Sequence, residues 1–135
     1  MAVIGFSFTK MIVERFSPVK GKISINNNVG VTSLEETKLD INTDKKSLKL
    51  SFEFTSAYEP KIAKILLQGE VIYLIDKDKA ADVIANWKKN KKLDNSILEQ
   101  VLNNVLAKCN VEALILSKDM NLPPPMALPK VGIKQ

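Results

Sequence analysis

The spacing of apolar residues changes once along the chain, close to residue 76. Before that point apolar side chains recur at every second position, most cleanly at Leu48, Leu50, Phe52 and Phe54. After it they recur every three or four positions, beginning with Ala80. A period of two is typical of a half-buried strand, and a period near 3.6 is typical of an amphipathic helix. Strands followed by helices predict an α+β fold, with an antiparallel sheet and two helices packed on one side.

The strands are expected at four places in the first half. The first runs from residue 3 to 16, with a bulge near Lys10 because the apolar parity changes there. Asn26 to Asn28 separate two short apolar pairs, and three residues that tolerate left-handed backbone angles predict a turn. Residues 48–55 form the third stretch. The last, residues 61–75, is apolar on both faces toward its end, so it needs cover on both, from a second sheet layer or from a subunit interface.

Two helices are expected after the sheet. The first ends in a lysine-rich turn, and its apolar stripe consists of Ala80, Val83, Ile84 and Trp87. The second begins with Ser96 and Glu99, a capping-box spacing in which the hydroxyl accepts from an early amide while the carboxylate reaches back. It should run from about residue 97 to 118. The 135 residues fit one domain, 1–135, which is large enough to bury a core.

The sequence offers little that could perform catalysis. It contains no histidine, and its five glycines are too scattered for a phosphate-binding loop. Cys109, the only cysteine, falls on the apolar face of the second helix, which favours a packed thiol over a nucleophile. Asp76 and Asp78 lack the glycine-bearing loop of a calcium site and are interpreted as the polar start of the first helix. We expect no enzymatic activity, no cofactor and no metal site.

The N-terminal stretch MAVIGFSF has no charged segment ahead of an apolar core and no small-residue cleavage site. The longest strictly apolar run, Val71 to Ile75, is far too short to span a bilayer. A lone cysteine suits a reducing compartment. A cytoplasmic protein that does not insert into membranes is therefore expected.

The net charge of +5 is concentrated in one stretch. Between Lys77 and Lys92 there are six lysines and only two aspartates, whereas the rest of the chain is nearly neutral. Two interpretations stay open: the cluster is a solvated turn between the helices, or it contacts RNA or the ribosome. The lysines that would make such a contact are Lys88, Lys89, Lys91 and Lys92. They lack the fork of an arginine side chain, and Arg15 is the only arginine.

The stretch MNLPPPMALPK, residues 120–130, follows the second helix. Its four prolines cannot continue a helix or donate hydrogen bonds within a sheet, and they favour an extended form whose ordering costs little entropy. Leu122, Met126 and Leu128 lie among them. Apolar side chains at these positions predict that the segment docks on the sheet or on a helix.

Two stretches and the order of elements resemble the SecB export-chaperone family. The first stretch is QGEVIYLI, residues 68–75, in which a glycine precedes the final hydrophobic strand; the second is the long helix from Ser96 followed by MNLPPPMALPK. The resemblance implies a four-stranded sheet with two helices, assembled as a dimer of dimers. It also implies ATP-independent holding of non-native or nascent polypeptides in apolar grooves, an activity that needs no nucleotide motif.

The same resemblance suggests residues for client contact. We expect Tyr58, Leu122, Met126 and Leu128 to contact clients, with Val71 and Tyr73 as further candidates. Each also has a structural interpretation, because Tyr58 precedes a turn and Val71 and Tyr73 lie in mid-strand. Bacterial SecB proteins are acidic and use that surface to bind the translocation motor SecA. This chain is basic, so the motor-binding site is not carried over.

Overall fold

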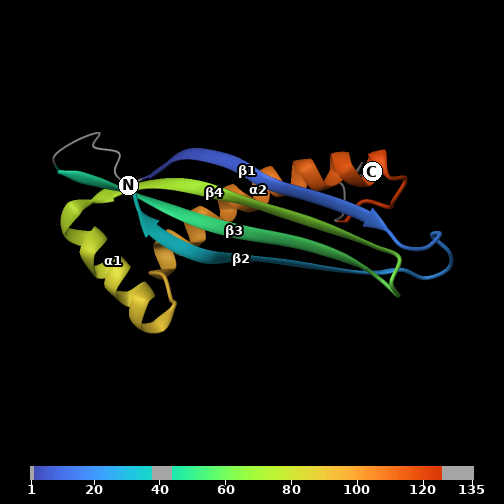
Figure 1. Cartoon of the computed structure of the whole chain (residues 1–135), viewed down its shortest axis with the longest axis horizontal. Helices are drawn as coiled ribbons and strands as arrows, with labels where there is room; N and C mark the ends of the chain where they lie inside the picture. Colours follow the sequence, from blue (N-terminus) through green and yellow to red (C-terminus); the bar gives the residue numbers. More distant parts are fainter. Residues whose placement is uncertain (1, 38–43, 126–135) are drawn as a thin grey trace, which may run out of the picture.

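The computed structural model describes residues 2–37 and 44–125, which form one antiparallel sheet and two helices (Figure 1). The sheet contains β1 (Ala2–Arg15), β2 (Ser24–Glu36), β3 (Lys45–Glu59) and β4 (Ala63–Asp76), in the spatial order β1-β4-β3-β2. The helices α1 (Lys77–Asn90) and α2 (Asn95–Asp119) follow. The predicted α+β fold of four antiparallel strands followed by two helices is therefore confirmed.

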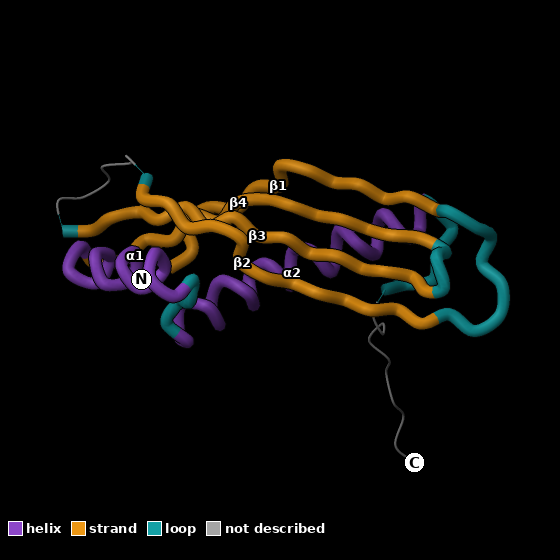
Figure 2. Tube along the Cα trace, turned by 60° about the horizontal axis from the view of Figure 1, so that its bottom comes forward, coloured by secondary structure: helices purple, strands orange, loops and turns teal. Residues whose placement is uncertain are grey.

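The sheet has one covered face and one open face, and both helices lie on the covered side (Figure 2). Along β4, buried and half-buried side chains alternate strictly. Ile65 and Val71 belong to the buried row, and both are fully inaccessible to solvent. Leu66 and Ile72 point the other way and are half-buried. The described residues form a single sheet, so they contain no second sheet layer that could cover this face of β4. Leu66 and Ile72 are nevertheless only half-exposed.

Phenylalanine rings crowd the middle of the sheet and explain a glycine there. The ring centroids of Phe6 and Phe52 lie 5.1 Å apart in a stacked arrangement, and Phe8 meets Phe6 edge-on at 5.0 Å. Gly69 is paired with Phe8 on one side and with Phe52 on the other. A Cβ atom at Gly69 would collide with the Ser7 carbonyl oxygen and lie 2.6 Å from the Phe52 ring. Gly69 thus lies inside β4, within the strand that the sequence predicts over residues 61–75 and not ahead of a final strand as in the resemblance to the SecB family.

The predicted turn at Asn26 to Asn28 is wrong. These residues lie within β2 and pair with residues 55–57 of β3. β2 is an edge strand, so polar side chains there can reach water without breaking the sheet. Asn27 lies on the covered face, where its side-chain oxygen accepts from Ser56 Oγ at 2.5 Å and its nitrogen donates to the Pro125 carbonyl at 2.8 Å. The bulge predicted near Lys10 is confirmed by a register shift between Phe8 and Lys10.

α2 runs beneath the sheet with one buried row of side chains, spaced four residues apart. The row consists of Ile97, Val101, Val105, Cys109, Ala113 and Ser117. Cys109 is fully buried, as the sequence predicted, and burial raises the pKa of its thiol to about 12. α1 lies at one end of the sheet and buries Ala80, Val83 and Trp87.

The predicted capping box of α2 is wrong. The helix starts two residues earlier than predicted, at Asn95, with Asp94 at the cap position. Ser96 Oγ donates to Asp94 Oδ2 at 2.6 Å, so the hydroxyl bonds the preceding aspartate instead of serving as the cap. At the start of α1 the interpretation holds, because Asp76 is the cap residue and Asp78 lies in the first turn.

Candidate functional site

Tyr58, predicted to contact clients, is buried under the chain's own C-terminal segment. Its side chain is only 1% exposed, and its hydroxyl donates to the Pro123 carbonyl oxygen at 2.6 Å. Burial raises the pKa of this phenol to about 12, because the charged form would lose its hydration. Tyr58 therefore acts in this structure as an anchor for the segment that follows α2.

Val71 and Tyr73 are also core residues in the described chain, on the covered face of β4. The Tyr73 hydroxyl donates to Gln100 Oε1 of α2 at 2.7 Å and so ties the sheet to the helix. Desolvation raises the pKa of Tyr73, and the negative charge of Asp94 adds to the shift. Neither side chain presents a surface to another molecule in this arrangement.

The proline-rich segment docks as predicted, as far as it is described. Asn121 adopts a left-handed φ of 55°, which turns the chain back from the end of α2. The Leu122 amide then donates to the Ser117 carbonyl at 2.8 Å, and the Leu122 side chain is 7% exposed. Pro125 is buried. Met126 and Leu128, also predicted to contact clients, lie outside the described residues.

Within residues 2–37 and 44–125, large apolar side chains are exposed at six positions: Ile4, Met11, Phe16, Val19, Val111 and Ile115. Val111 and Ile115 are one turn apart on α2, on the side turned away from its buried row, and are 58% and 47% exposed. Ile4 and Met11 lie on β1, an edge strand that pairs only with β4 among the described residues. Adjacent exposed apolar side chains mark surfaces for contact with other chains.

A groove of about 400 Å³ lies between the end of α1, the start of α2 and β2. Its apolar lining comes from Val31 of β2, Trp87 of α1, Leu93 of the connection and Leu98 of α2. Trp87 and Leu93 are each 9% exposed, so only the margins of these side chains reach the groove. Because Lys91 and Lys92 also line it, we call this feature the lysine-rimmed groove.

Two of the four clustered lysines border this groove. Lys91 Nζ lies 5.7 Å from the centroid of the Trp87 ring, a cation–π arrangement, and Lys92 also lines the groove. Lys88 and Lys89 occupy the last turn of α1 and are exposed. The structure thus brings the lysine cluster next to an apolar hollow, which sequence analysis did not anticipate.

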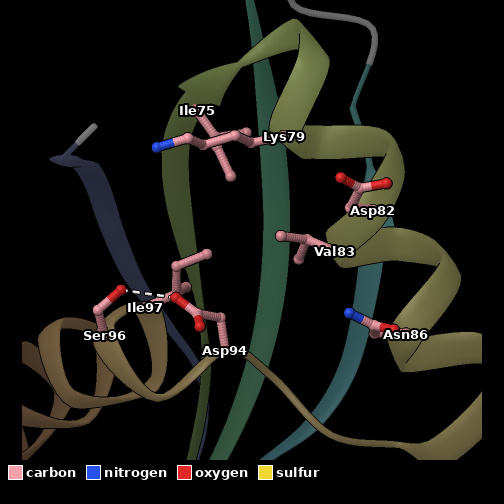
Figure 3. A pocket seen from close by; sticks show the side chains of 8 residues that line it. All are labelled: Ile75, Lys79, Asp82, Val83, Asn86, Asp94, Ser96 and Ile97. Carbon is pink, nitrogen blue, oxygen red and sulfur yellow. Dashed lines mark hydrogen bonds between the residues drawn. The ribbon is translucent and has the colours of Figure 1, made fainter.

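A second hollow, of about 290 Å³, lies on the other side of the connection, next to β4 (Figure 3). Ile75, Val83 and Ile97 form its apolar part. Asp82 and Asp94 approach it from α1 and from the connection, and the close-up shows them on different sides of the hollow. Lys79 also lines this second hollow, so it combines two carboxylates with one amine, whereas the charged residues that line the lysine-rimmed groove are all lysines.

Within residues 2–37 and 44–125, no cluster of histidine, cysteine, aspartate or glutamate is arranged to hold a metal ion. In the same part of the chain, neither helix is long and apolar enough to cross a membrane.

Sequence reasoning found the lysines but missed the apolar surfaces beside them and on α2. Val111 and Ile115 were readable as apolar positions outside the stripe that holds Val105 and Cys109. Val31 could not be linked to Trp87 from sequence, because 56 positions of chain separate the strand from the helix, and only the fold brings them together.

Comparison with known proteins finds similarity in structure but not in sequence. No family model matches the sequence. No curated protein matches it either. Among solved structures, one match is the SecB-like chaperone Rv1957 of Mycobacterium tuberculosis, in complex with a ChAD peptide from the Rv1956 HigA1 antitoxin. The alignment covers 98% of this chain and 91% of that chain, with a TM-score of 0.55 and 8% sequence identity. At this identity the likeness concerns the fold, so this chain has the fold of a SecB-like chaperone.

Proposed function

We propose that this protein is an ATP-independent chaperone that binds non-native or nascent polypeptides through apolar surfaces. One observation carries the proposal: nearly the whole chain shares its fold with a SecB-like chaperone that was solved with a peptide bound. The proposed role needs binding surface and no catalytic group, cofactor or metal, and we place it in the cytoplasm.

The exposed apolar side chains support this function. A holding chaperone must offer adaptable apolar surface that many extended sequences can cover. Val111 and Ile115 on α2, together with Met11 on β1, offer such surface. The same positions suit contacts between copies of the chain, and we propose that the protein works as a homo-oligomer, either a dimer or a tetramer.

The first test is suppression of aggregation without nucleotide. A chemically unfolded model protein is diluted into buffer with increasing amounts of this protein, and light scattering is recorded. We expect scattering to fall as the two proteins approach comparable concentrations. Unchanged scattering over the whole range would refute the proposed function.

A double variant tests the contribution of α2. Val111→Ser with Ile115→Ser removes exposed apolar area, and we expect it to weaken suppression roughly thirty-fold, since each of the two exposed aliphatic side chains contributes about 1 kcal/mol when covered. The matched control is Asn103→Ser with Lys108→Ser, two exposed polar positions on the same helix. Light scattering coupled to gel filtration reports whether the first pair also changes the oligomeric state. Equal suppression by both variants would remove α2 from the client surface.

A further inference from the structure

The positive charge around the lysine-rimmed groove is not neutralised within the described parts of the chain. The ion pairs formed among the described residues use Lys45, Lys46 and Lys49 of β3. None of them involves the lysines at 88, 89, 91 and 92. The carboxylate nearest in sequence, Asp94, accepts from Ser96 and lines the other hollow. The groove therefore combines an apolar lining with cations that have no carboxylate partner among residues 2–37 and 44–125.

Such a groove is complementary to a segment that carries both apolar side chains and carboxylates. The half-buried Val31 and Leu98, which line the groove, offer cover to aliphatic or aromatic side chains. Lys91 and Lys92 lie at the margin, where a carboxylate on the same segment would remain partly hydrated while it pairs with an amine. Binding also relieves the mutual repulsion of four amines held within five residues.

The same features disfavour RNA as the occupant. Binding of single-stranded RNA relies on aromatic faces on which bases stack, and on arginine forks that grip phosphates. The one tryptophan is 9% exposed, and Lys91 lies over its ring. The one arginine, Arg15, ends β1, far along the sheet from this groove. The lining of the groove favours a polypeptide that supplies carboxylates beside apolar residues.

We infer that the lysine-rimmed groove binds extended polypeptide segments in which apolar residues stand next to aspartate or glutamate. The inference rests on the proposed chaperone function and specifies its substrate class. It predicts that clients are chosen by charge as well as by hydrophobicity, with acidic flanks preferred over basic ones.

The test uses two fluorescein-labelled peptides of equal length. They share one central run of leucine, valine and phenylalanine; one is flanked by glutamates and the other by lysines. Fluorescence anisotropy gives the affinity of each for the full chain. We expect the acidic peptide to bind roughly ten-fold tighter at low salt, the product of several weak exposed ion pairs. This ratio should shrink as salt rises.

A charge variant locates the effect. Replacing Lys88, Lys89, Lys91 and Lys92 by glutamine should abolish the preference for the acidic peptide and leave the affinity for the lysine-flanked peptide equal or higher. The control replaces four exposed lysines elsewhere by glutamine, namely Lys10, Lys20, Lys22 and Lys64. It changes the net charge by the same amount and should keep most of the preference. All these positions are on the surface, so both variants should retain the circular dichroism of the parent.

Three results would overturn the inference. The first is equal affinity for both peptides, and the second is a preference that survives in the groove variant but not in the control. The third is tighter binding of a labelled oligouridine RNA than of the acidic peptide, lost in the groove variant. None of these refutes the chaperone proposal, which depends on suppression of aggregation and fails only there.

Discussion

The hydrogen bond from Tyr58 to the Pro123 carbonyl gives a prediction that depends on pH. Tyr58→Phe keeps the ring and removes only the hydroxyl. At pH 7 we expect the free energy of unfolding to fall by about 1 kcal/mol, the net contribution typical of one hydrogen bond. The Pro123 carbonyl is left without its donor, which places the loss at or slightly above that figure.

The pKa of Tyr58 makes this difference shrink at alkaline pH. The phenol titrates at 10.0 in an unfolded chain and at about 12 in the folded one. A raised folded pKa means that the stability is complete below pH 10 and is lost as pH rises through 12. At pH 11 the wild-type protein has lost about 1.4 kcal/mol through this group, since one pH unit separates it from the unfolded pKa. Phenylalanine has no proton to lose, so the two proteins should be about equally stable there.

Urea unfolding at pH 7 and pH 11 measures the difference in free energy of unfolding between the wild-type protein and Tyr58→Phe at each pH. Trp87, the only tryptophan and 9% exposed, reports unfolding by fluorescence, and circular dichroism checks it. All other titratable groups are common to the two proteins, so their effects cancel in the difference between them. A deficit in Tyr58→Phe that stays constant from pH 7 to pH 11 would contradict the burial of this hydroxyl. No deficit at pH 7 would contradict the hydrogen bond.

Two other predictions concern packing. Gly69→Ala should lower the free energy of unfolding by about 3 kcal/mol or more, because the new Cβ would overlap the Ser7 carbonyl oxygen and the Phe52 ring. At Gly30 an added Cβ would meet no atom within 4 Å, so Gly30→Ala should change the free energy of unfolding by no more than about 0.5 kcal/mol. Equal melting temperatures for the two variants would refute the crowding at Gly69. Cys109 should resist a thiol reagent in the folded protein even at pH 10, since its pKa is about 12, and should react quickly in urea; fast reaction without urea would show that the thiol is accessible.

Periodic elements were predictable from the sequence, and contacts between distant residues were not. The alternation at Leu48 to Phe54 and the fourfold spacing through Val101 and Val105 each identified an element, because burial on one side imposes its period on the sequence. The turn predicted at Asn26 to Asn28 is wrong because pairing with β3 outweighs the local preference of asparagine for turns. The capping box predicted at Ser96 is wrong because the helix already begins at Asn95, so Ser96 lies inside the first turn and Asp94 takes the cap position.

The candidate site was harder to predict than the fold. Tyr58 looked available because its partner lies 65 positions away, in a segment whose own position the sequence left open. The lysines at 88 to 92 were visible as charges, but the apolar groove beside them is assembled from β2, α1 and α2 together. A surface composed of several elements leaves no local pattern in any one of them.

The docked proline segment is recognised mainly through its backbone. Tyr58 and Asn27 both donate to carbonyl oxygens, those of Pro123 and Pro125. Every polypeptide presents such oxygens, and these two donors do not distinguish one sequence from another. Besides the packing of Leu122 and Pro125 and the bond from the Leu122 amide to Ser117, the segment is held by proximity, because its attachment to the end of α2 gives it an effective concentration on the order of millimolar or higher. Any extended chain that competes for these two donors must exceed that local concentration.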